Sequence, residues 1–300
     1  MNLPCVPMGL RRREVHRLKN CLSKKPADES ETGWEGFSAG ESSAMACQPW
    51  RAYCDRMHWR LIQRWVGESH FRRALKTDLF DESVGEGCCG ALAKIADGVE
   101  GIDISAEVVQ SASRRNPAMK LSVGDVRSLD FADASFDLVL SNSTLDHFAT
   151  VQEIEQSIRE ISRVLDENGI LILTMDNPWN PIVALRNTLP QNLTCRAGLI
   201  PYFMGRTLTM RALIRAVENA GLRVQRRRYI QHAPRVAALH LCRVLGKQGR
   251  LPSSLVTTML AMETLAGWPS AALTGHYSAL LAKKPGDPQS LAAFSGTKHG

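Results

Sequence analysis

Residues 151–175 read VQEIEQSIREISRVLDENGILILTM, and this stretch predicts a helix, a turn and a buried strand in succession. Its first part repeats apolar residues at helical spacing, namely Val151, Ile154, Ile158, Ile161 and Leu165. Asn168-Gly169 ends the helix, and the apolar run 170–175 is typical of a parallel strand covered on both faces. A helix that leads directly into such a strand indicates an α/β fold.

The same alternation of strands and helices extends toward the N-terminus. Four earlier strands are expected, at residues 74–81, 99–103, 121–125 and 136–141. Helices are expected at 88–96 and 106–115, and Ser105 suits the N-cap of the second because its hydroxyl can accept a free first-turn N–H. Strands that alternate with helices imply a parallel sheet with both faces covered.

Further elements are expected on either side of this core. A helix over residues 53–66 precedes the first strand, and others are expected at 208–220 and within 234–265. Two more strands are expected at 222–230 and 276–283. The fold expected is therefore α/β: a Rossmann-like, mostly parallel seven-stranded sheet with helices on both faces.

Charge and composition suggest how the chain is organised. Residues 1–25 carry seven lysines and arginines against one glutamate, which accounts for most of the formal net charge of +7. We expect a disordered basic segment over 1–50, one domain over 51–285 with a Pro-rich insertion or lid near 177–205, and a flexible tail over 286–300. Outside the basic segment only Arg226-Arg-Arg228 forms a basic cluster, so a nucleic-acid partner is not favoured.

Several classes of protein are disfavoured by the sequence. The eight cysteines include no C-x-x-C pair and no Cys/His cluster at zinc spacing, so no metal site is expected. We expect the cysteines to be reduced thiols in a cytoplasmic protein. Residues 264–282 carry no charge, but glycine and proline interrupt them, so buried core or an apolar substrate wall is favoured over a transmembrane span. Nothing in the sequence indicates an oligomeric state.

Small or acidic residues follow four consecutive expected strands. They are Asp81, Gly85 and Gly87 after the first, Asp103 after the second, Gly124-Asp125-Val126 after the third, and Ser141-Asn142 after the fourth. In open parallel sheets, ligands bind at the carboxyl ends of the strands. A carboxylate such as Asp103 can accept hydrogen bonds from both hydroxyls of a ribose, and glycine lets the backbone pass close to a ligand. These strand ends therefore predict a nucleoside-containing ligand.

Residues 74–176 resemble the core of class I S-adenosylmethionine-dependent methyltransferases of the small-molecule type. The first motif of that family usually reads D-x-G-x-G-x-G; Asp81, Gly85 and Gly87 match it, whereas Ser83 stands at the first glycine. The resemblance implies S-adenosylmethionine as the cofactor. It also implies that Asp103 holds the ribose, Ile104 packs on the adenine, Asp125 accepts the adenine amino group beside Val126, and Asn142 borders the cofactor.

Candidate residues for the methyl acceptor lie on either side of this core. His147 is the expected general base, with an unperturbed pKa near neutrality, and Asp146 is expected to orient it or to bind substrate. Packing of His147 against the following helix is an equal alternative. Tyr53 and His58, on the helix before the first strand, are expected to contact the substrate, against the alternative of a surface helix with an apolar core face.

Two other functions stay open at this point. Gly85-Glu-Gly87-Cys-Cys-Gly90 also spells the dinucleotide motif G-x-G-x-x-G, which would indicate a nicotinamide-dependent oxidoreductase. Asp103 lies only thirteen residues beyond Gly90, short of the usual ~20. Ser83 also leaves open a non-catalytic protein that binds an adenosyl ligand. For a methyltransferase, the apolar stretches 177–205 and 264–282 favour a small hydrophobic acceptor such as a lipid, quinone or polyketide.

Overall fold

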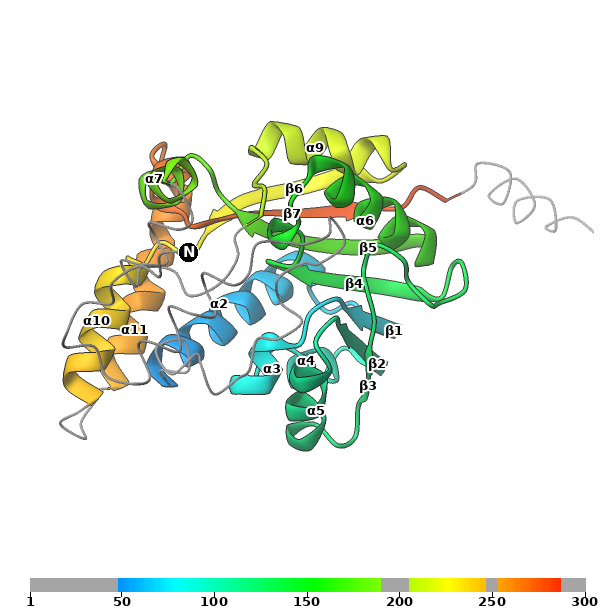
Figure 1. Cartoon of the computed structure of the whole chain (residues 1–300), viewed down its shortest axis with the longest axis horizontal. Coiled ribbons are helices and arrows are strands. Elements are labelled where there is room, and N and C mark those ends of the chain that lie inside the picture. Colours follow the sequence, from blue (N-terminus) through cyan, green and yellow to red (C-terminus); the bar gives the residue numbers. More distant parts are fainter. Residues whose placement is uncertain (1–47, 190–204, 247–252, 287–300) are drawn as a thin grey trace, which may run out of the picture.

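A single seven-stranded sheet organises the chain, whose computed structural model describes residues 48–189, 205–246 and 253–286 (Figure 1). Its spatial order is β3-β2-β1-β4-β5-β7-β6. Strands β1 to β5 pair in parallel, and β7 runs antiparallel to both of its neighbours. The strands are β1 (Phe71–Lys76), β2 (Ala96–Asp103), β3 (Lys120–Val123), β4 (Phe136–Asn142), β5 (Leu165–Asp176), β6 (Arg223–Ile230) and β7 (Tyr277–Lys283).

Helices cover both faces of this sheet, because alternate side chains of the central strands are apolar on both sides. Leu138 and Leu140 of β4 pack in one core with α2, α10 and α11, whereas Val139 packs in a second core with α6 and α9. The helices are α2 (Gln48–Val66), α3 (Phe80–Val84), α4 (Cys89–Leu92), α5 (Ala106–Arg115), η2 (Leu145–His147), α6 (Val151–Val164), α7 (Pro181–Thr188), α9 (Met210–Asn219), α10 (Arg235–Gly246), α11 (Ser253–Ala261), η3 (Met262–Gly267) and α12 (Ala271–Thr274).

The expected fold class is confirmed, but the bounds of several elements differ from those expected. Helix α6 ends at Val164 and β5 begins at Leu165, so Asn168-Gly169 lies within the strand and does not end the helix. Strand β1 occupies 71–76, not 74–81, because the chain turns after Lys76 and α3 begins at Phe80. Helix α4 is only four residues long, since β2 already begins at Ala96. Ser105 caps α5 as expected, its hydroxyl accepting from the Val108 amide.

The outer segments are described only in part. Helix α2 begins at Gln48, so the last three residues of the segment expected to be disordered are helical, and residues 1–47 lie outside the described residues. The expected insertion contains α7, while 190–204 lie outside the described residues, as do 287–300. No helix of the described chain is long and apolar enough to cross a membrane.

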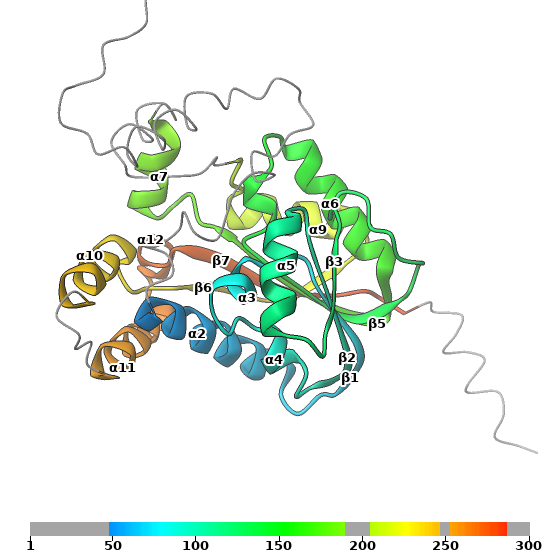
Figure 2. The same ribbon diagram turned by 60° about the horizontal axis from the view of Figure 1, so that its bottom comes forward.

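One end of the sheet is built to receive a ligand. Antiparallel β7 places Tyr277, its first residue, opposite Asp176, the last residue of β5. The start of β7 therefore meets the carboxyl ends of the parallel strands. Helices α7, α10, α11 and α12 gather at this end of the molecule, beside the beginning of α2 (Figure 2).

Candidate active site

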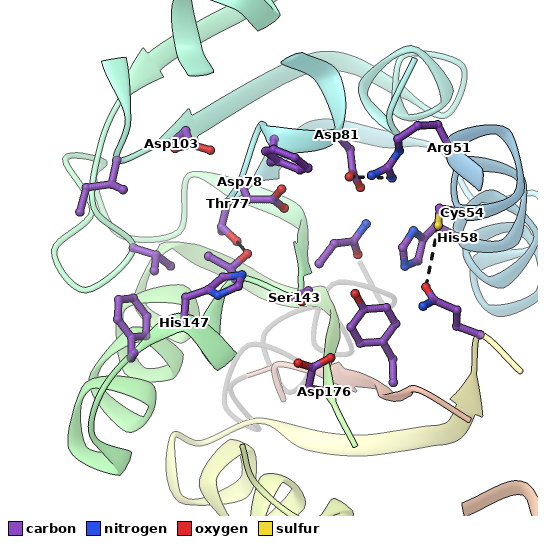
Figure 3. A pocket seen from close by; sticks show the side chains of 18 of the residues that line it. Arg51, Cys54, His58, Thr77, Asp78, Asp81, Asp103, Ser143, His147 and Asp176 are labelled. Carbon is purple, nitrogen blue, oxygen red and sulfur yellow. Dashed lines mark hydrogen bonds and ion pairs between the residues drawn. The ribbon is translucent and has the colours of Figure 1, made fainter. Parts of the chain in front are cut away.

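A cavity lies at the carboxyl ends of the parallel strands, where open α/β sheets bind their ligands. Its walls come from α2, the β1–α3 connection, the ends of β2 to β5, η2 and the start of β7. Figure 3 shows Asp103 and His147 on one side of the cavity, and Arg51, Cys54 and His58 on the other. We call these two sides the β2 side and the α2 side.

On the β2 side, Asp103 ends strand β2 and faces the cavity. Its Oδ2 accepts from the Leu79 amide and its Oδ1 from the Ser105 amide, both at 2.9 Å. Burial raises the pKa of this carboxyl, while the two amides favour its charged form. Each oxygen of a carboxylate has a second lone pair, so Asp103 can still accept from a ligand hydroxyl.

Ile104, Gly124, Asp125 and Val126 complete the wall next to Asp103. Ile104 and Val126 supply apolar contacts suited to the faces of a flat ring. The carboxylate of Asp125 is held by its neighbour Arg127, whose Nε lies 2.9 Å from Oδ2. An adenine amino group would therefore share the Asp125 carboxylate with Arg127.

The connection after β1 holds a buried network of charges in place of a glycine turn. Lys76 Nζ donates to Asp78 Oδ2 at 3.1 Å and to Glu82 Oε2 at 2.9 Å. Burial alone would lower the pKa of Lys76, but these two carboxylates raise it well above its usual value. Glu82 Oε1 also accepts from the amides of Cys88 and Cys89 at the start of α4. The network fixes the path of Thr77 and Asp78 along the cavity.

Ser83, Gly85 and Gly87 are the residues of the family motif expected at the ligand, and the turn into α3 separates them from the end of β1. None of the three lines the cavity. Ser83 is buried and its hydroxyl donates to the Phe80 carbonyl. Gly87 has a φ of +62°, and a Cβ there would overlap the Glu82 carboxyl group. Gly87 therefore leaves room for the Glu82 carboxyl group of the charge network. Asp81, in α3, does line the cavity.

On the α2 side, Arg51 forms an ion pair with Asp81, with Nη2 2.7 Å from Oδ1. Burial opposes the charge of Asp81, but Arg51 and Lys76 hold its pKa below the usual value. Asp55, one turn along α2, has its pKa raised to about 7 by burial and by the charge of Asp81. Asp81 is therefore the ionised partner of Arg51.

His58 and Asn142 bring unpartnered polar atoms to the cavity. Neither ring nitrogen of the buried His58 has a hydrogen-bond partner in the described part of the chain, and the same holds for Asn142 Oδ1. Burial lowers the pKa of His58 to about 4, so its ring is neutral near pH 7. Buried polar groups normally have partners, so both residues are positioned to bind a ligand.

Of the expected catalytic pair, His147 lines the cavity and Asp146 does not. Asp146 is buried, and its carboxylate accepts from the Ser143 hydroxyl and from the Asp176 amide. Its Oδ1 lies 3.9 Å from His147 Nε2, beyond hydrogen-bond distance. Asp146 therefore fixes the turn after β4 to the end of β5.

Tyr53, which was expected to contact the substrate, lies in the hydrophobic core at 0% exposure and does not line the cavity. Its hydroxyl donates to Glu263 at 2.5 Å. Glu263 also accepts from the amides of Gln231 and His232. Tyr53 thus holds the connection after β6 against α2, and Gln231 from that connection lines the cavity.

Several lining residues were not predicted from the sequence. Thr77 and Asp78 would follow from the strand-end rule if β1 were ended at Lys76, and Asp176 follows from it at the end of β5. Arg186 and His276 lie 2.7 and 3.3 Å from Asp176 and hold its pKa below the usual value, although burial opposes its charge. Other lining residues come from distant parts of the chain, and no local signal marks them; they include Trp50, Arg51, Cys54, Gln231, Arg235 and Tyr277.

Residues 84–173 match the family described as a methyltransferase domain. The matched segment lies within residues 74–176, which resemble the core of class I S-adenosylmethionine-dependent methyltransferases. It is 34% identical over 80 residues to malonyl-[acyl-carrier protein] O-methyltransferase 1 of Coxiella burnetii, covering 27% of this chain and 26% of that protein. It is 26% identical over 143 residues to demethylmenaquinone methyltransferase of Chlorobaculum parvum, covering 45% of this chain and 58% of that protein. The chain spans at most about half of the length of several curated relatives that it matches.

Solved structures of low sequence identity share this methyltransferase fold. An S-adenosylmethionine-dependent methyltransferase from Methanosarcina mazei has a TM-score of 0.51 and 16% identity, over 76% of this chain and 98% of that one. The [4+2]-cyclase SpnF has a TM-score of 0.50 and 19% identity, over 91% of this chain and 93% of that one. Because a cyclase shares the fold, the reaction has to be argued from the site.

Proposed function

We propose that this protein transfers a methyl group from S-adenosylmethionine to a small-molecule acceptor. The observation that carries the proposal is Asp103 at the end of β2, facing the cavity between Ile104 and the residues that follow β3. This arrangement suits an adenosine group, with Asp103 on the ribose hydroxyls and Ile104 and Val126 on the ring. Asn142 Oδ1, buried without a hydrogen-bond partner among the described residues, supplies a further acceptor for a ligand N–H or O–H.

The polar groups of the site favour S-adenosylmethionine over a dinucleotide. Asp103 borders the cavity with a lone pair free on each carboxylate oxygen, whereas Asp78 and Asp81 are already paired with Lys76 and Arg51. The diphosphate of NAD would instead meet these carboxylates without a glycine turn to hold it. The motif Gly85-x-Gly87-x-x-Gly90 lies outside the cavity, so the structure does not favour the nicotinamide alternative.

The protein's part in methyl transfer is to hold acceptor and cofactor close and aligned, while the cofactor supplies an electrophilic methyl group. A general base is required only where the acceptor must lose a proton. His147 stands beside Asp103, on the side proposed for adenosine, so we assign it to the cofactor. The names of the Coxiella burnetii and Chlorobaculum parvum relatives, a malonyl-carrier and a demethylmenaquinone methyltransferase, support a small or lipid-like acceptor.

Calorimetric titration with S-adenosylhomocysteine and, in parallel, with NADH tests this proposal. We expect S-adenosylhomocysteine to bind with one site per chain and NADH to give no heat of binding. Transfer of a labelled methyl group to small hydrophobic acceptors would then separate an enzyme from a protein that only binds the cofactor. Binding of NADH alone would overturn the proposal.

A further inference from the structure

The α2 side of the cavity is a second compartment that the proposed adenosine site does not use. Trp50, Arg51, Cys54 and His58 come to it from α2, and Asp176 and Tyr277 from the ends of β5 and β7. The two aromatic rings and the thiol give it largely apolar walls. Figure 3 shows His58 directed into this compartment, on the same side as Cys54 and Arg51 of the same helix.

His58 is one of the residues of this compartment whose hydrogen-bonding capacity is unused. The residue is 6% exposed, and both of its ring nitrogens lack a partner in the described residues. Leaving a buried donor or acceptor unpaired is unfavourable, so this conformation is maintained at a cost in free energy that a ligand can remove. Arg51 Nε, also buried and unpartnered among the described residues, lies on the same helix.

Two carboxylates of this compartment each face a cation. Asp81 is bound by Arg51, and Asp176 lies 2.7 Å from Arg186 and 3.3 Å from His276, although its Oδ1 has no hydrogen-bond partner among the described residues. A charged acceptor would therefore have to compete with an existing ion pair for its counter-charge, at a cost in desolvation. A neutral imidazole offers one N–H and one lone pair, and a hydroxyl group can donate to the one and accept from the other.

Resting on the proposed function, we propose that the α2 side binds a neutral aromatic acceptor that carries a hydroxyl group, and that His58 accepts its proton. An oxygen lone pair forms the bond to the methyl carbon, and the carbon–sulfur bond breaks with its electron pair staying on sulfur. The hydroxyl proton passes to the free ring nitrogen of His58 and then to solvent. The imidazolium gains the positive charge that the sulfur loses, so the site keeps its net charge.

The location of His58 distinguishes it from His147, the base predicted from the sequence. His147 lies near Asp103, whereas His58 lies across the cavity beside the Arg51–Asp81 pair. Tyr277, whose ring centroid is 6.3 Å from that of His58, and Trp50 provide surfaces for an aromatic ring in the same compartment. His147 is thus assigned to the cofactor and His58 to the methyl acceptor.

The proposal is tested by titrating the full chain, ¹⁵N-labelled at histidine, with phenol, benzylamine and benzoate while recording the ring-nitrogen NMR signals. These probes carry one aromatic ring with a neutral, a positive and a negative group. Phenol should shift the His58 signals and bind at least tenfold more tightly than the other two. His58→Gln should weaken phenol binding at least tenfold and leave S-adenosylhomocysteine affinity unchanged, whereas the exposed control His70→Ala should leave both unchanged.

Each titration is run with and without S-adenosylhomocysteine, so that the two proposals fail separately. Absence of S-adenosylhomocysteine binding would contradict the proposed function, while the phenol contact with His58 is still measured. Phenol binding that is equal in His58→Gln, or tighter binding of benzylamine or benzoate, would overturn the inference. Failure of phenol to shift the His58 signals would overturn it as well.

Discussion

The carboxyl ends of β1 and β2 lie side by side and are built in opposite ways. Strand β2 ends in Asp103, whose carboxylate accepts two backbone N–H groups, and Ser105 then caps α5. Strand β1 ends in Lys76, whose buried ammonium joins Asp78 and Glu82. The end of β2 is held by local hydrogen bonds and keeps its carboxylate at the cavity. The conformation of the end of β1 depends on three buried charges that must all be present together.

Removal of Lys76 should have the largest effect, because it leaves two carboxylates buried without their cation. Breaking a buried ion pair from one side costs about 3–5 kcal/mol, so Lys76→Met should lower the free energy of unfolding by that amount. Urea denaturation measures the change. The exposed Lys94→Met serves as control and should stay within about 0.5 kcal/mol of the native chain. Equal stabilities of the two variants would contradict the role given to the network.

Gly87→Ala should follow, with an expected loss of about 2–4 kcal/mol in the free energy of unfolding. Its φ is +62°, and the added Cβ would meet the Glu82 carboxyl group. Gly67→Ala is a matched control, since Gly67 has a φ of +61° and no atom near its Cβ position. The control should lose only about 1 kcal/mol from the backbone conformation. A difference of zero between the variants would show that contact with Glu82 does not constrain this turn.

His58 should make the stability of the chain depend on pH. Because its pKa falls from 6.5 in the unfolded chain to about 4, the unfolded state binds the proton first and stability decreases as the pH falls through this range. The expected loss at pH 5 relative to pH 7.5 is about 2 kcal/mol. Asp55 and Asp78, each with a pKa raised to about 7, act in the opposite direction.

His58→Gln should therefore isolate this contribution. Urea denaturation of both chains at pH 7.5 and pH 5 should show that the variant lacks the His58 part of the change. The charged groups that influence the pKa of His58 are Asp81, Arg51 and Lys76, and the variant retains all three. The same pH dependence in both chains would mean that His58 is not a buried neutral base.

At the end of β2, Ser105→Ala should produce the smallest effect, about 1 kcal/mol in the free energy of unfolding. Its hydroxyl accepts one amide of the first turn of α5, that of Val108 at 3.4 Å. Urea denaturation should show a loss well below that of Lys76→Met. A larger loss would mean that the two strand ends are equally dependent on their polar groups.

This contrast also explains what could be predicted from the sequence. Asp103 and Ser105 were correctly placed because each signal depends on residues within a few positions. The glycines at 85 and 87 fit the spacing of the family motif but serve Glu82, since β1 ends five residues earlier than expected. Tyr53 and His58 share one helix, and only packing against Glu263 and the cavity distinguishes their roles.

The most direct test of the account is the affinity of S-adenosylhomocysteine for the native chain and for Asp103→Asn. The substitution preserves size but removes the charge that is proposed to hold the ribose hydroxyls. Two charge-assisted hydrogen bonds at about 1.5–3 kcal/mol each predict a loss of at least about tenfold in affinity with the fold intact. Equal affinities, or no binding by the native chain, would contradict the assignment of this cavity to the cofactor.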